Sequence, residues 1–155
     1  VDPTWANQHA LEIARLETTT LTGVDQFFAW YNLGTSYINL QDYASAAQSY
    51  DQAFLTYANL PDNNQRPFRM VWYQTGPYFA YYYSGRYQDV LDLANTTFAT
   101  IQDRLVLEES LYWRGMAKVA LGDIAGAEED FRRSLVIHPD FAPTLEAMRN
   151  LGLTP

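Results

Sequence analysis

The side chains able to do chemistry are few, and they do not form a catalytic set. The chain has two histidines, His9 and His138, and no cysteine. It therefore has no thiol nucleophile, no disulfide and no thiolate metal ligand. No HExxH, GxSxG or phosphate-binding loop occurs. We predict no catalytic residues, no bound metal and no cofactor, and we expect that this chain by itself is not an enzyme.

The carboxylates also fail to suggest a reactive centre. They occur in short runs, Glu108-Glu109 and Glu128-Glu129-Asp130, and neighbours on a helix point in different directions. Asp89 and Asp92 share a helix face and allow weak cation binding as an alternative, but a solvated face is the commoner role for such a pair.

Charge and composition exclude further classes of function. The chain has 155 residues, of which 48% are hydrophobic, and 10 basic residues against 18 acidic ones give a net charge of -8. An acidic chain without a basic stripe repels a phosphate backbone, which argues against nucleic-acid binding. No apolar run is long enough to span a membrane.

Repeated intervals indicate how the chain is organised. Gly34 and Ala46 are 12 residues apart, and so are Gly115 and Ala127. The first copy reads Trp30, Leu33, Gly34, Tyr37, Ala46, Tyr50 and Ala53, the third reads Leu111, Gly115, Lys118, Ala127, Phe131, Ser134 and Pro139, and a middle copy includes Tyr87, Val90, Ala94 and Thr97. Apolar side chains at helical spacing within each copy predict amphipathic helices in pairs.

This pattern resembles the tetratricopeptide repeat, over roughly residues 27 to 141. The resemblance implies an all-α fold, a right-handed superhelix of antiparallel helix pairs, within a single domain covering 1–155. We divide it into an N-terminal helix (1–22), repeat 1 (24–60), repeat 2 (68–102), repeat 3 (104–139) and a capping helix (141–151). We expect eight helices, at about 3–17, 24–40, 43–58, 68–83, 87–100, 104–121, 124–137 and 141–151.

Several helix ends are predicted from capping residues. Asp42 and Asp123 stand where helices begin and can accept a bond from free backbone N–H groups. Thr22-x-x-Asp25 has the form of a capping box. Pro3 fits the first turn of the first helix, and His138 lies before Pro139 where it can interact with the last carbonyls of a helix.

Small residues are expected where paired helices cross. Gly34 and Ala46 are small, and each should face the partner helix, so that small against small lets the two helices approach closely and Gly34→Leu would overpack the contact. The middle copy departs from the pattern, with Tyr78 in place of the small residue and Pro77 before it. We expect its first helix to be irregular, because proline inside a helix removes a bond and clashes with the preceding turn.

In tetratricopeptide folds the first helix of each pair lines the concave surface. By that register the candidate partner groove consists of Tyr31, Thr35, Ile38, Asn39, Trp72, Phe79, Tyr82, Tyr83, Tyr112, Trp113 and Met116. Such aromatic side chains anchor protein interfaces well. The alternative is that several of these rings fill the core, since Tyr81, Tyr82 and Tyr83 cannot all face solvent.

The resemblance also excludes one kind of ligand. Domains of this family that grip chaperone tails present Lys, Asn, Asn, Lys and Arg across the groove. The matching positions here hold Tyr31, Thr35, Gly76, Glu109 and Trp113. Recognition of a free carboxylate tail is therefore not expected.

Three segments also resemble the repeat tail of bacterial proteins in which a C39-like peptidase domain comes first: 10–17, 72–77 and 107–115. This resemblance implies that the chain, which starts at Val1, is a fragment of a larger bacterial protein with an extracytoplasmic location. A separate peptidase-like domain would then carry the chemistry.

The leading prediction is a non-catalytic scaffold that binds a protein or peptide segment in the aromatic groove. Two alternatives stay open. The domain could pack on its parent chain or form a homodimer through the same face, or the rings could stack on cell-wall glycan.

Overall fold

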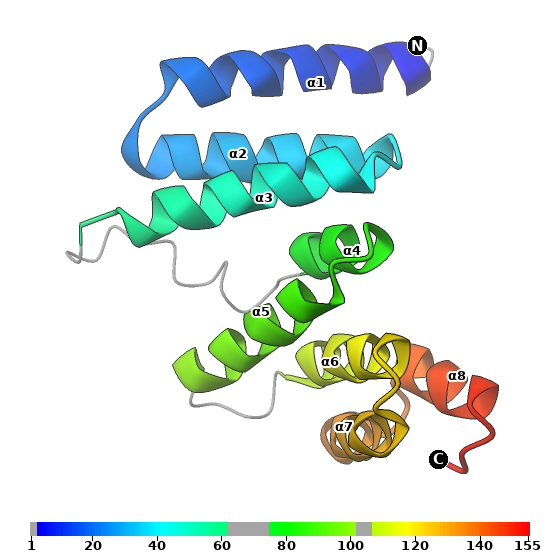
Figure 1. Ribbon diagram of the computed structural model, residues 1–155. Helices are drawn as coiled ribbons and strands as arrows, with labels where there is room; N and C mark the ends of the chain where they lie inside the picture. The colour runs from blue at the N-terminus through cyan, green and yellow to red at the C-terminus, as the bar shows by residue number, and fades with distance from the viewer. Residues whose placement is uncertain (1–2, 62–74, 102–106) are drawn as a thin grey trace.

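The computed structural model describes residues 3–61, 75–101 and 107–155, which fold as a stack of α-helices (Figure 1). In chain order these helices are α1 (Pro3–Thr20), α2 (Gly23–Asn39), α3 (Tyr43–Ala58), α4 (Thr75–Tyr83), α5 (Tyr87–Thr100), α6 (Glu108–Ala120), α7 (Ile124–Ile137) and α8 (Ala142–Asn150). No strand occurs in these three segments.

Consecutive helices pack as antiparallel hairpins that follow one another along the stack. The most extensive contacts are between α2 and α3 and between α6 and α7, while α1 packs on α2 and α8 packs on α6 and α7. Contacts of α4 with α3 and of α5 with α6 join the successive pairs (Figure 1). The predicted all-α solenoid of helix pairs is confirmed.

The helix caps explain most of the boundaries. The side chain of Asp42 accepts a bond from Ser45 N at 3.1 Å, and Asp123 accepts one from Gly126 N at 2.9 Å, as predicted. Thr22 is the N-cap of α2, but its side chain makes no capping bond, so the predicted capping box is wrong. His138 is the C-cap of α7, and its ring lies against Phe141.

Glycine allows close approach in the first and third pairs, but its partner is an aromatic ring. A Cβ at Gly34 would lie 2.8 Å from the ring of Tyr50, and one at Gly115 would lie 2.5 Å from the ring of Phe131. Gly34 therefore faces the partner helix as expected, but the group nearest to it there is the ring of Tyr50 and not a small residue. In both pairs an aromatic ring packs directly against the glycine backbone. A larger residue in place of either glycine is therefore still expected to overpack the contact.

The middle pair reverses these sizes. Tyr78 stands at the position of Gly34 and Gly115, and Ala94 stands at the position of Tyr50 and Phe131. Tyr78 and Ala94 are both fully buried in the same cluster. In this pair the large residue is therefore on the first helix and the small one on the second.

Proline is accommodated at the start of the described part of α4. Pro77 is the third described residue of this helix, and it is buried. Residues 68–74, where we predicted an earlier start, lie outside the described residues.

Candidate partner-binding surface

Six aromatic side chains from α3, α4 and α6 form one continuous cluster, which we call the aromatic surface: Tyr43, Phe79, Tyr82, Tyr83, Tyr112 and Trp113. Ring centroids lie 4.6 Å apart for Phe79 and Tyr83, 5.5 Å for Tyr82 and Trp113, and 5.1 Å for Tyr112 and Trp113. Tyr43 joins from α3, with its ring 5.2 Å from that of Tyr83. These are the edge-to-face and tilted contacts that aromatic rings prefer.

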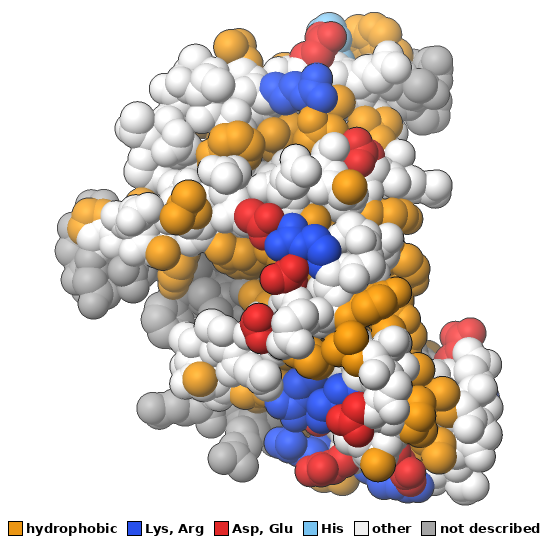
Figure 2. All heavy atoms as spheres, viewed as in Figure 1, with side chains coloured by type: hydrophobic (Ala, Val, Ile, Leu, Met, Phe, Trp, Pro, Cys, Tyr) orange, Lys and Arg blue, Asp and Glu red, His pale blue; other side chains and the backbone are white. Residues whose placement is uncertain are grey.

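The rings of the aromatic surface differ in their exposure. Trp113 is only 4% exposed and forms the floor, whereas Tyr83 is 52% exposed. Phe79, Tyr82 and Tyr112 are half-buried. Figure 2 shows hydrophobic side chains gathered along one edge of the molecule, over α4 and between α6 and α8. The cluster is thus partly core and partly surface, and Tyr81, at 4% exposed, belongs to the core.

The other predicted groove residues are more dispersed. Tyr31 is buried, while Ile38 and Met116 are half-buried against the main core. Thr35 and Asn39 are exposed, and the hydroxyl groups of Thr35 and Tyr50 share a hydrogen bond of 3.2 Å. Trp72 lies outside the described residues.

A carboxylate lies where α4 meets α6. Glu109, half-buried in the first turn of α6, accepts a hydrogen bond from the Thr75 hydroxyl at 3.0 Å. Its other oxygen accepts one from the Trp113 indole Nε1–H at 3.4 Å. Glu109 therefore stands between the floor of the aromatic surface and the start of α4.

Three tyrosine hydroxyl groups in this part of the molecule are held in their neutral form. Burial, then the neighbouring Tyr50 and Glu109, raises the pKa of Tyr31 well above its usual value. Burial raises the pKa of Tyr78 to about 12, although a hydrogen bond with Ser110 opposes this shift. Burial likewise raises the pKa of Tyr112 to about 12, with smaller contributions from Tyr83 and Tyr82. These tyrosines are protonated hydrogen-bonding groups at neutral pH and are not acids or bases.

A hollow of about 510 Å³ is lined by side chains of α2 and α3. Its floor is Trp30, Leu33 and Tyr37, and side chains of α3 complete the lining: Ser45, Gln48, Ser49, Asp51 and Gln52. We did not predict this hollow, because such an open space depends on how α1, α2 and α3 are placed.

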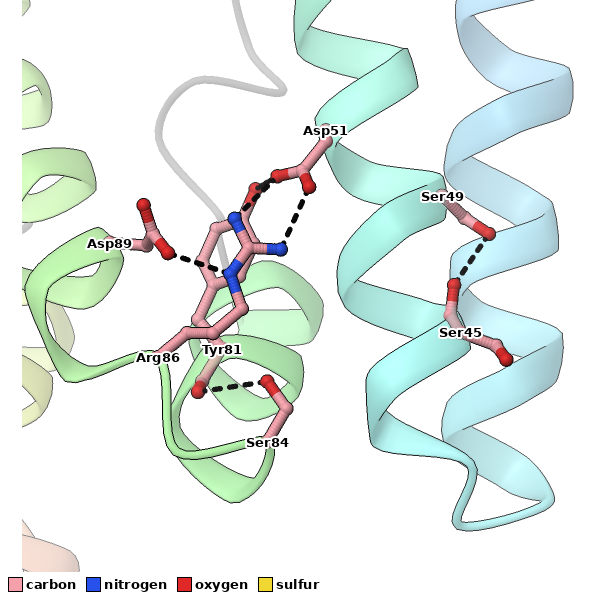
Figure 3. Close-up of polar contacts among 7 residues, drawn as sticks. All are labelled: Ser45, Ser49, Asp51, Tyr81, Ser84, Arg86 and Asp89. Carbon is pink, nitrogen blue, oxygen red and sulfur yellow. Dashed lines mark hydrogen bonds and ion pairs between the residues drawn. The ribbon is translucent and has the colours of Figure 1, made fainter.

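Beside the hollow, an arginine links two helix pairs (Figure 3). The guanidinium of Arg86 contacts Asp51 of α3 at 2.7 Å and Asp89 of α5 at 2.6 Å. The Tyr81 hydroxyl donates to Asp51 at 2.9 Å. Hydrogen bonds with the carboxylates of Asp51 and Asp89 raise the pKa of Arg86 above its usual value. Asp89 is therefore occupied by Arg86, which argues against the cation site considered for Asp89 and Asp92.

A second ion-pair network is centred on Asp130, which is 1% exposed. Its carboxylate accepts from Arg114 Nε at 2.8 Å and lies 2.8 Å from Lys118 Nζ. Arg114 also donates to Asn95 of α5 and lies over the ring of Phe98. In the sequence Asp130 is one of three consecutive acidic residues and has no distinguishing feature. Its ion pairs with Arg114 and Lys118 show that it stabilises the fold.

Neither a cluster of metal ligands nor a membrane-spanning helix is found among the described residues. Within residues 3–61, 75–101 and 107–155, no group of three or more His, Cys, Asp or Glu residues could hold a metal ion. None of the helices described above has the length and apolar character needed to cross a membrane.

Comparisons with known proteins agree with this architecture. Two family models, each described as Tetratricopeptide repeat, match residues 27–58 and 109–140. These segments cover α2 with α3 and α6 with α7, the pairs in which a glycine meets an aromatic ring. No curated protein and no solved structure matches the chain. The resemblance to C39-like peptidase proteins stays a prediction.

Proposed function

Because this chain carries a tetratricopeptide-repeat domain, we propose that it is a non-catalytic scaffold that binds a protein or peptide segment on the aromatic surface. Tetratricopeptide repeats are protein-interaction scaffolds, and this supports the general role. The particular surface is supported by the structure of α4 and α6.

The observation that carries the proposal is the graded exposure of the aromatic surface. Trp113 is buried and fixes the rings above it, while Tyr82 and Tyr83 present the edges and faces that a partner could cover. Tyrosine side chains that are already held by neighbouring rings lose little conformational entropy on binding. A segment laid along α4 and α6 would therefore gain contact area at low entropic cost.

The test is selection of peptide ligands from a random library with this chain as bait, followed by affinity measurement on variants. We expect Tyr83→Ala to weaken binding of the selected peptides by about 1–3 kcal/mol, since exposed anchoring tyrosines commonly contribute this much. Isothermal titration calorimetry would give the change in affinity, and circular dichroism would show an unchanged fold.

Tyr57→Ala provides the control, because this half-buried tyrosine lies on α3 against Phe27, away from the aromatic surface. Trp113 is unsuitable for the test, because truncating a 4% exposed ring would also destabilise the fold. Selected peptides that bind Tyr83→Ala as tightly as the unchanged chain would refute the proposed surface.

A second candidate function, a fixed contact between this domain and another part of its parent chain or a second copy, is favoured by α1. This helix buries Ala14 and Thr18 against α2, yet Trp5, Ile13 and Leu16 are more than half exposed on the opposite face. A helix with two apolar faces is typical of the interior of a stack. Light scattering distinguishes the two-copy form, and a monomer at high concentration would eliminate it.

A further inference from the structure

We propose that Glu109 makes the aromatic surface selective for a segment carrying a cationic side chain, arginine or lysine, which the carboxylate binds beside Trp113 and Tyr31. This inference rests on the proposed binding of a peptide segment and adds the chemistry of the residue recognised. It predicts that the partner contributes the positive charge and that this surface contributes the negative one.

The position of Glu109 is fixed by two helices. The Thr75 hydroxyl from α4 donates to Oε2 and the Trp113 indole donates to Oε1, so the carboxylate is held by one neutral donor on each oxygen. A carboxylate has about four lone-pair sites for hydrogen bonds, so two remain after these contacts. Neither donor neutralises the charge, and among the ion pairs between described residues none includes Glu109.

Three carboxylates that lie between helices, Asp51, Asp89 and Asp130, have a different environment. Asp51 and Asp89 are paired with Arg86, and Asp130 is paired with Arg114 and Lys118. These pairs lie between helices and stabilise the stack. Glu109 instead lies beside the aromatic surface, where a charge partly removed from water attracts a counter-charge more strongly than a fully solvated one.

The surroundings of Glu109 suit a cation more than a neutral polar group. The ring of Trp113 packs beside the carboxylate, and Glu109 lies near enough to Tyr31 to influence its hydroxyl. Both donors on the carboxylate are neutral, so its negative charge remains available to a counter-charge. The net charge of -8 would assist the approach of a basic segment.

The experiment uses two capped pentapeptides, Ala-Ala-Arg-Ala-Ala and the same peptide with citrulline in place of arginine. Citrulline has nearly the same shape and no charge. Binding is followed by the nuclear magnetic resonance signal of the Trp113 indole N–H, which donates directly to Glu109. We expect the arginine peptide to shift this signal saturably and the citrulline peptide to bind at least about tenfold more weakly.

Two variants separate the carboxylate from general electrostatics. Glu109→Gln keeps an acceptor oxygen for the indole and removes the charge, so the preference for arginine should disappear. Glu129→Gln makes the same change on the exposed face of α7 and should leave the preference intact. Added salt should weaken the arginine peptide and leave the citrulline peptide unchanged.

Each contrary result has a definite meaning. Equal affinities for the two peptides, or an unchanged preference in Glu109→Gln, would overturn the cation inference while the aromatic surface could still bind peptides. Absence of any shift with the arginine peptide at millimolar concentration would also overturn it. The broader proposal fails separately, if library-selected peptides ignore the Tyr83→Ala change.

Discussion

At the scale of single residues, buried charge is balanced locally. Asp130 is almost fully removed from water and faces the guanidinium of Arg114 and the ammonium of Lys118. Removal of one partner from a buried ion pair leaves the remaining charges without compensation, which costs more than the pair itself contributes. Asp130 therefore contributes to stability because it is buried between Arg114 and Lys118.

We expect Asp130→Ala to destabilise the domain by about 3–5 kcal/mol, because Arg114 and Lys118 would keep their charges without the carboxylate between them. Urea denaturation followed by circular dichroism measures the change in free energy of unfolding. Glu128→Ala is the matched control, since Glu128 forms an exposed pair with Arg132 on the same helix and should cost less than about 1 kcal/mol. Similar effects from the two substitutions would contradict this view of Asp130.

At the scale of helices, the contact inside each pair depends on complementary sizes. A glycine on the first helix receives a ring from the second in the pairs α2–α3 and α6–α7. In the pair α4–α5 the ring belongs to Tyr78 on the first helix, and Ala94 on the second is small. At the corresponding positions of the middle copy, the large and the small residue are therefore exchanged between the two helices.

A methyl group at Gly115 should show this rule directly. We expect Gly115→Ala to destabilise the domain by about 1–3 kcal/mol, because the new Cβ would lie 2.5 Å from the ring of Phe131. The double variant Gly115→Ala with Phe131→Leu should cost less than the sum of the two single changes, since the smaller side chain makes room for the methyl group. Thermal unfolding of all four proteins gives the coupling, and strictly additive effects would refute the proposed contact.

The sequence predicted these helices well because their signals are local. Periodic apolar residues gave the pairs, and Asp42 and Asp123 gave two starts, since a cap needs only the backbone a few residues away. The partner of Gly34 could not be deduced in the same way, because it depends on how two helices rotate against each other. The burial of Trp113 and the pairing of Asp130 depend on side chains from other helices, and periodicity does not specify these contacts.

At the scale of the whole molecule, aromatic side chains supply much of the core. The main cluster contains Tyr50, Tyr78, Phe27 and Trp113, and several of its polar hydroxyl groups are hydrogen-bonded inside the protein. Such a core is stable only while these hydroxyl groups remain neutral. The free energy of unfolding should consequently decrease at alkaline pH.

Burial raises the pKa of both Tyr50 and Tyr78 to about 12, from 10.0 in the unfolded chain. Their contribution to stability is complete below pH 10 and is lost as pH rises from 10 towards 12, because the unfolded chain releases these protons first. Near pH 11 each should reduce the free energy of unfolding by about 1 kcal/mol. Urea denaturation at several alkaline pH values measures this loss, and stability that stays constant from pH 9 to pH 11 would contradict the assignment.

The two ends of the stack differ in a way that affects how the molecule could be enlarged. At α8 the buried residues are Thr144, Ala147 and Met148, while Glu146 and Arg149 face water. On α1, the exposed side chains of Trp5, Ile13 and Leu16 form an apolar face like the faces with which internal helices pack against their neighbours. An engineer who wished to lengthen this solenoid could therefore graft a new hairpin before α1 with little redesign, whereas growth beyond α8 would first require its polar side to be rebuilt.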